Sequence, residues 1–200
     1  MRWDRFFDDL EDQLASGWEA ERAALDTEAE RLRLSRVSLR DRLRGLVGLD
    51  RSAPLPSFEF SDGSLTSAHI ATVGADWLAL ETPGAGESAI IAPLASITGI
   101  GMPEADLLRT ARAASAGADL SERMTFGFVL RDLVRRRSGV TLHLGNGRLL
   151  TGTIDRAGVD HLDLALHDPG SPRRAADVRG FRVVPFAAIA WVRVEGRSSI

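Results

Sequence analysis

The sequence Val140-Thr-Leu-His-Leu-Gly-Asn-Gly-Arg-Leu-Leu-Thr-Gly-Thr-Ile154 opens a series of short segments that continues to Val194. Apolar and polar residues alternate within the segments, and turn formers such as Asn146-Gly147 separate them. This arrangement is typical of half-buried strands joined by hairpins. It predicts five strands, at residues 140–144, 148–155, 160–166, 181–184 and 189–194.

A similar, shorter series lies earlier in the chain. We call residues 57–101 repeat one and residues 139–194 repeat two. An offset of 84 places Asp62-Gly63 on Asn146-Gly147 and gives seven identities within residues 57–80, at positions 63, 65, 70, 74, 76, 78 and 80. An offset of 92 then places Pro93 on Pro185, so repeat two has an eight-residue insertion before its fourth strand (92 − 84 = 8). The matches fall on turn and core positions, which indicates one small β-structure present twice.

A helix is predicted before each repeat. In residues 1–47, apolar positions recur three and four apart, which predicts one long helix or two helices end to end, with Gly17 as a break. Residues 119–137 have the same character. Both helical segments contain Leu-Arg-Asp, at 39–41 and 130–132, so the order of helix and strands recurs as well.

The N-terminal helical segment carries a ladder of large apolar residues at seven-residue spacing. Two interpretations stay open: the ladder self-associates as a coiled coil, or the helix lies on its own β-structure. The candidate self-association residues are Trp18, Leu25, Leu32, Leu39 and Leu46.

Charge is distributed unevenly along a chain whose formal net charge is −3. Every cation is an arginine, and the absence of cysteine excludes disulfides, thiolate chemistry and cysteine-based zinc sites. Residues 50–101 hold 1 Arg and 6 acidic residues, whereas residues 139–200 hold 8 Arg and 6 acidic residues. Repeat one is therefore a poor surface for nucleic acid and repeat two a modest one.

The N-terminal sequence is too acidic for a signal peptide, and no apolar run is long enough to cross a bilayer. We therefore expect a cytoplasmic protein that has no membrane among its partners.

A helix followed by five short strands, with a glycine inside strand two (Gly152) and a longer loop between strands three and four, resembles the Sm-like fold. The resemblance covers residues 56–101 and 120–194. It implies a mainly β protein with two five-stranded antiparallel barrels, a helix before each, and barrels that pair edge to edge, strand four with strand five. The chain is also similar to a poorly characterised bacterial group loosely labelled as transcriptional regulators, although its sequence contains no helix-turn-helix.

The patterns and the resemblance together divide the chain into four segments. These are an N-terminal amphipathic helix at 1–50, a first Sm-like barrel at 56–101, a linker or weak helix at 102–118, and a helix with a second barrel at 119–195.

No catalytic, metal or cofactor motif is visible, so we expect neither an enzyme nor a small-molecule substrate. The four histidines lack the converging spacing of a metal site, and no serine has a histidine partner at recognisable spacing. Sm-like proteins read RNA near the positions of His161 and Asp163, where an Asn is expected at 163, and in an Arg-Gly loop whose place is taken here by Pro185-Phe186-Ala187.

Two functional hypotheses remain. The first is a non-enzymatic adaptor or scaffold that self-associates through barrel edges or the N-terminal helix, as a homo-oligomer or with a protein partner. The alternative is an RNA- or DNA-binding regulator. Its candidate residues lie around repeat two: Arg131, Arg135, Arg136, Arg137, Arg148, His161, Arg173, Arg174 and Arg179.

Overall fold

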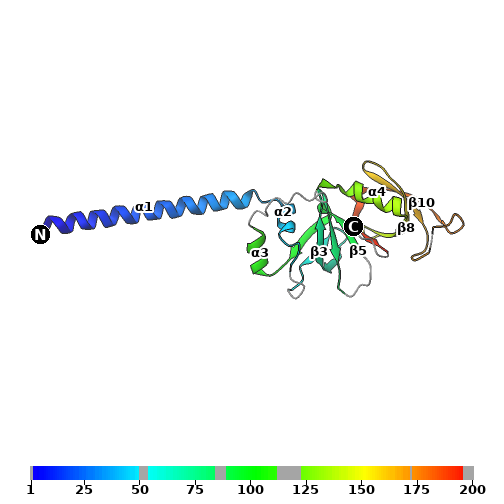
Figure 1. The fold of residues 1–200 in the computed structure, drawn as a ribbon, viewed down its shortest axis with the longest axis horizontal. Coiled ribbons are helices and arrows are strands. Elements are labelled where there is room, and N and C mark those ends of the chain that lie inside the picture. Colours follow the sequence, from blue (N-terminus) through cyan, green and yellow to red (C-terminus); the bar gives the residue numbers. More distant parts are fainter. Residues whose placement is uncertain (1, 50–53, 84–88, 112–122, 172, 196–200) are drawn as a thin grey trace. The chain divides into compact units, whose positions relative to one another are not determined.

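The computed structural model describes residues 2–49, 54–83, 89–111, 123–171 and 173–195, in two compact units, Met1–Ser38 and Leu39–Ile200 (Figure 1). The first unit contains helix α1 (Arg2–Ser35). The predicted break at Gly17 is wrong, because α1 continues through it; one glycine costs a helix only about 1 kcal/mol. Along α1 the side chains of Trp18, Leu25 and Leu32 are exposed.

The second unit begins with helix α2 (Leu39–Arg44), so the N-terminal segment is two helices rather than one. The exposure of the apolar ladder residues changes in this unit. Leu39 is still exposed, but Leu46 is 2% exposed and lies with Leu43 in a core that contains Phe58. Leu46 is therefore a core residue, and its assignment to a self-association surface is wrong.

Eleven strands form the β-structure of the described residues. In repeat one they are β1 (Ser57–Phe60), β2 (Leu65–Ser67), β3 (His69–Val73), β4 (Trp77–Glu81), β5 (Ala89–Pro93) and β6 (Ile97–Gly101). In repeat two they are β7 (Gly139–Leu144), β8 (Leu149–Ala157), β9 (His161–Leu166), β10 (Gly180–Pro185) and β11 (Ile189–Val194).

Antiparallel hydrogen bonding joins these strands into two open sheets, with orders β2-β1-β6 and β10-β9-β8-β7-β11-β5-β4-β3. The predicted combination of antiparallel strands with an N-terminal helix is confirmed. In the described part of the chain the ladders close no barrel.

The strand registers confirm the internal repeat. With the offsets of 84 and 92, the pairs Phe58–Ile100 and Trp77–Pro93 of repeat one become Leu142–Val192 and His161–Pro185 of repeat two. The ladder irregularities recur as well, after Ile70 in repeat one and after Ile154 in repeat two. The two repeats therefore share one pattern of strand pairing, and a feature of one can be sought at the equivalent residue of the other.

One substitution between the repeats changes the sheet. Gly152 belongs to the continuous strand β8 and pairs with both Val140 and Leu166. A Cβ at Gly152 would lie 1.9 Å from the Ala165 carbonyl oxygen, so only glycine fits. Repeat one has Ala68 at the equivalent place, and the strand is interrupted there into β2 and β3. The replacement of this glycine by Ala68 thus coincides with the point at which repeat one is divided between two sheets.

The shared Leu-Arg-Asp sequence has a structural role. Arg40 of α2 donates to the Gly74 carbonyl at 2.7 Å, and Arg131 of helix α4 (Phe126–Arg136) donates to the Gly158 carbonyl at 3.1 Å. Gly74 and Gly158 are equivalent turn residues of the two repeats. In each repeat, an equivalent arginine therefore hydrogen-bonds the helix to the turn glycine of that repeat.

Within the predicted linker, Glu104–Thr110 forms helix α3, and residues 112–122 lie outside the described residues. Of the helix predicted at 119–137, the structure shows α4 only over Phe126–Arg136; residues 119–122 lie outside the described residues, and the Thr125 side chain begins the helix by accepting a hydrogen bond from the Phe128 N–H. None of the described helices is both long and apolar enough to cross a membrane.

We predict that Gly152→Ala destabilises the protein by about 1–3 kcal/mol, because the added methyl group must displace backbone rather than a flexible side chain. Urea denaturation would measure the change. Gly145→Ala is the matched control: its Cβ would first meet the Ser61 hydroxyl at 3.3 Å, and a smaller loss is expected. Equal losses at both glycines would contradict the steric explanation.

Candidate interaction surface

The two repeats are joined edge to edge within the chain. Strand β11 of repeat two pairs with β5 of repeat one, and Val192 lies opposite Ile91. We call this pairing the junction. Strand five of one repeat meets strand four of the other, which is the edge pairing that the Sm-like resemblance implies.

Each repeat completes the core of the other at the junction. Trp77, Ala79 and Ile91 of repeat one are at most 2% exposed and belong to the core that is otherwise built from repeat two and α4. In return, Ala190 and Trp191 of repeat two belong to the core of repeat one. The two cores are therefore interdependent.

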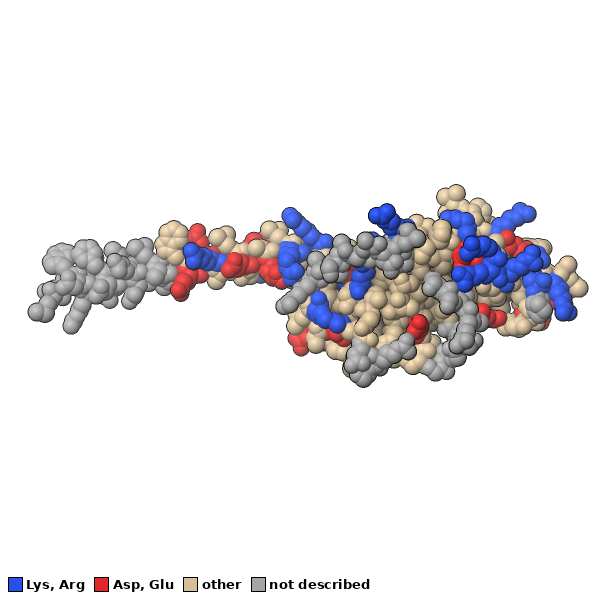
Figure 2. All heavy atoms as spheres, viewed as in Figure 1, with Lys and Arg blue, Asp and Glu red and all other residues tan. Residues whose placement is uncertain are grey.

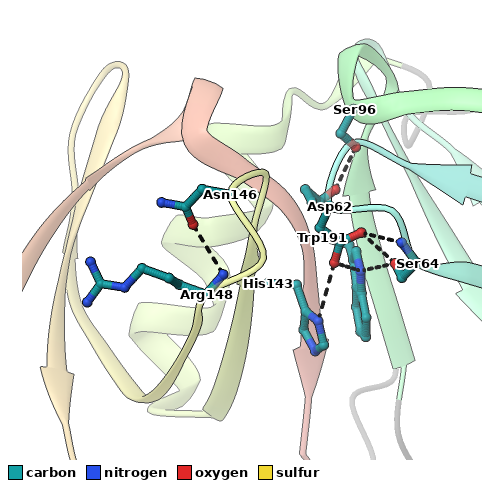
Figure 3. A network of polar contacts seen from close by, with 8 residues as sticks. Asp62, Ser64, Ser96, His143, Asn146, Arg148 and Trp191 are labelled. Atoms are coloured by element: carbon teal, nitrogen blue, oxygen red, sulfur yellow. Dashed lines mark hydrogen bonds and ion pairs between the residues drawn. The ribbon is translucent and has the colours of Figure 1, made fainter.

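A polar contact fixes the buried Trp191. Its indole Nε1 donates to Asp62 Oδ2 at 3.0 Å and to Ser64 Oγ at 2.9 Å, and the Ser64 hydroxyl donates to Asp62 Oδ1 at 2.6 Å (Figure 3). The ring of His143 stacks on the indole, with 3.3 Å between ring centroids. The β1–β2 turn of repeat one is thereby tied to the last strand of repeat two.

The environment of this contact perturbs two titrating groups. Burial raises the pKa of Asp62, but hydrogen bonds from Ser64 and Trp191 outweigh that effect and hold the pKa below 3.8. Burial lowers the pKa of His143 below 6.5; Asp62 opposes this shift and Arg193 adds to it. His143 therefore resists protonation in the folded protein.

Asp62→Ala is expected to lower the free energy of unfolding by about 1–3 kcal/mol, because it leaves the buried indole N–H with one acceptor fewer. Thermal or urea unfolding would measure the loss. Asn146→Ala is the control, because Asn146 is the equivalent turn residue and accepts from the Arg148 N–H as Asp62 accepts from the Ser64 N–H. If both variants lose the same stability, the effect belongs to the turns and not to the junction.

Stability is expected to fall as the pH drops below about 6.5, because the unfolded chain binds a proton at His143 more readily than the folded protein does. The contribution of Asp62 is present above pH 3.8 and is lost only as the pH falls through its lower folded pKa. Urea unfolding at pH 7.5 and 5.5 should therefore show a smaller difference in His143→Phe than in the wild type. An unchanged difference would exclude His143 as the source.

Two strands equivalent to those of the junction pair on one side only, with β9 and with β1, and have no partner at the other edge among the described residues. They are β10, the counterpart of β5, and β6, the counterpart of β11. On β10, Phe181 and Val183 are 59% and 68% exposed, whereas Ile91, the counterpart of Val183, is completely buried. The edge that is covered in repeat one is thus an exposed apolar edge in repeat two.

An apolar groove of about 190 Å³ lies between α2, α3 and β6. We call it the α2–β6 groove. Apolar side chains dominate its lining, among them Leu39, Leu43, Leu46, Ile100, Met102 and Leu107, together with the charged Arg42.

The arginines proposed for nucleic-acid binding are mostly engaged with the protein itself. The Arg131 side chain donates to the Gly158 carbonyl, whereas Arg137, which ends α4 with a left-handed backbone, is exposed. Ion pairs account for Arg135 and Arg136 with Asp132, Arg173 with Asp155, and Arg179 with Asp168. Figure 2 shows the same intermingling of basic and acidic side chains on this part of the surface.

Three other predicted residues are exposed around repeat two: Arg148, Arg174 and His161. His161 Nδ1 lies 2.8 Å from Asp160 Oδ1. Among the described residues, no group of three or more histidines and acidic residues could hold a metal ion.

Sequence reasoning missed Phe181, Val183 and the α2–β6 groove. The offset of 92 makes Phe181 and Val183 the equivalents of Ala89 and Ile91, and this correspondence was visible in the sequence. Its meaning depends on the pairing of β5 with β11, which only the structure shows. The groove had no sequence signal, because it depends on how α2 and α3 lie against β6.

Comparison of the chain with protein-family models, with curated proteins and with solved structures gave no match.

Proposed function

We propose that this protein is a non-enzymatic assembly module: an adaptor or scaffold built from two Sm-like barrels that self-associates through its free barrel edges. Support for the Sm-like assignment comes from the recurrence of a helix followed by antiparallel strands, five in repeat two and six in repeat one, where the second strand is interrupted. Further support comes from the pairing of strand four with strand five at the junction.

One observation carries the proposal. The junction joins the repeats through β5 and β11, yet their counterparts β10 and β6 pair on one side only, with β9 and β1, and have no partner at the other edge among the described residues. A flat edge with exposed apolar side chains invites another strand unless charge or proline protects it. Strand β10 has Arg182 as its only charged residue, with Phe181 and Val183 on either side, and its one proline, Pro185, is the last residue of the strand.

The exposed ladder of α1 offers a second route to self-association. Trp18, Leu25 and Leu32 follow at seven-residue spacing on one helix and are 65%, 64% and 52% exposed. Leucine at one core position of each heptad suits a two-stranded coil, but Arg22 and Ala29 occupy the other core position. This route is therefore weaker per heptad than a coil with apolar residues at both positions.

The alternative, an RNA- or DNA-binding regulator, has less support. Phosphate binding needs arginines that release counterions on contact, and ion pairs within the protein compete with that role. Arg173 and Arg179 are both paired to carboxylates, and the same holds for Arg135.

The proposal predicts that light scattering over a concentration series gives masses above the monomer mass of 21.6 kDa. Val183→Asp places a charge on the free edge and should shift the distribution toward monomer. Val159→Asp is the matched control. Val159 is 94% exposed and lies outside the strands, so this substitution should leave the distribution of masses unchanged.

Leu25→Asp with Leu32→Asp distinguishes the two routes, because only association through α1 responds to it. A monomer at every concentration would overturn the proposal. Single-stranded RNA added to the same samples at low and moderate salt tests the alternative: salt-sensitive binding that Arg173→Ala and Arg174→Ala weaken would favour the regulator.

A further inference from the structure

Helix α1 carries apolar side chains that nothing in its own unit covers. The unit Met1–Ser38 contains α1 and no other described helix or strand. Trp18, Leu25 and Leu32 are each more than half exposed on it. Most helices in proteins owe their stability to the packing of an apolar face rather than to helix propensity. The apolar face of α1 therefore calls for a partner from outside this unit.

The apolar residues of α1 are arranged symmetrically along the sequence. The first half of the helix has its own pair at seven-residue spacing, Phe7 and Leu14, which mirrors the pair Leu25 and Leu32 in the second half. The residue numbers add to the same value in both combinations, 39 for 7 with 32 and 39 for 14 with 25. Two such helices that run in opposite directions can therefore bring apolar residues together at both places.

We infer that α1 pairs with α1 of a second copy of this chain, antiparallel and over its full length, with Phe7 opposite Leu32 and Leu14 opposite Leu25 of that copy. The inference rests on the proposed self-association and specifies the direction and register of its α1 contact.

This register also places the two residues that are least suited to a two-stranded coil. Gly17 comes opposite Arg22 of the second copy, because their numbers again add to 39. The missing side chain of Gly17 leaves room for the arginine stem to cross the apolar seam and carry its charge to water. In a parallel pair in register, Arg22 would instead lie opposite Arg22, which opposes like charges within the seam.

The distribution of charge along α1 favours the same direction. Residues 2–12 hold five acidic residues and two arginines, whereas residues 28–36 hold two acidic residues and three arginines. The second count already includes the two glutamates that pair with arginines on the same helix. The antiparallel arrangement brings the acidic end of one copy beside the basic end of the other, and a parallel arrangement would bring the two acidic ends together.

The matching features lie within one helix, so a second copy is the partner that supplies them. Positions 7 and 32 of α1 are about 38 Å apart along the axis, at about 1.5 Å per residue, and cannot meet within one straight helix. A two-fold symmetric contact solves this problem, because residue i of one copy meets residue j of the other and each pair forms twice.

The chain has no cysteine, so single cysteines introduced on α1 report which positions face each other. Full-length chains that carry Leu14→Cys are mixed with chains that carry Leu25→Cys under mild oxidation, and a tag on one chain separates mixed dimers from like dimers. The mixed dimer is expected to exceed either like dimer several-fold. In the inferred register, like positions are about 16 Å apart along the axis, too far for a disulfide.

Phe7→Cys mixed with Leu32→Cys tests the same register with an independent pair, so the test stands where one substitution weakens the contact. Thr27→Cys in place of Leu25→Cys is the matched control for random collision. Thr27 is exposed and lies two residues from Leu25, on the opposite side of the helix. Phe7→Cys mixed with Leu25→Cys is displaced by seven residues from the register and should give no more than this control.

The outcomes separate the inference from the proposed function. If the wild type is oligomeric by light scattering but neither pair gives mixed dimers above the collision control, the inference is wrong and self-association through the β edges stands. If Leu25→Cys alone gives like dimers at the yield of the mixture, the helices pair in parallel and the inference is equally overturned. A monomeric wild type overturns both.

Discussion

The exchange of core residues across the junction is the constraint on which the rest of the structure depends. Trp191 fills the core of repeat one, while Trp77 and Ile91 fill the core of repeat two. Burial of large apolar side chains is the main stabilising contribution in a protein of this size. Because each repeat borrows that contribution from the other, neither is a complete domain, and the second compact unit contains both.

The junction also explains why equivalent positions of the two repeats have different surroundings. Asp62 and Asn146 are equivalent turn residues of the two repeats, yet only Asp62 accepts a hydrogen bond from a buried indole. Hydrogen bonds from Ser64 and Trp191 keep the pKa of the Asp62 carboxylate low. Equivalent positions have thus diverged according to whether a neighbouring repeat covers them. The same divergence separates Ile91, completely buried, from Val183, largely exposed.

Much of this fold could be predicted from the sequence, because turns and alternation are local signals. The offsets of 84 and 92 correctly related the pairs of one repeat to those of the other, and Gly152 was singled out as the glycine inside the second strand, although its close approach to the Ala165 carbonyl was not predicted. Contacts between the repeats could not be predicted, because the alternation of apolar and polar residues does not show that Ile91 pairs with Val192. Leu46 was misassigned for a related reason. Seven-residue spacing does not reveal that the helix ends at Arg44 and that Leu46, beyond it, is buried in the core of repeat one. The arginines were visible, but their pairing with Asp132, Asp155 and Asp168 required three-dimensional neighbours.

The order of synthesis gives the junction a further consequence. Strand β5 leaves the ribosome well before β11, so Trp77 and Ile91 remain uncovered on the nascent chain until repeat two has been made. During that interval a strand from another polypeptide can satisfy the same contacts, which is the basis of domain swapping. Local chain concentration during translation, and not only the native contacts, therefore decides whether the junction forms within one molecule or between two.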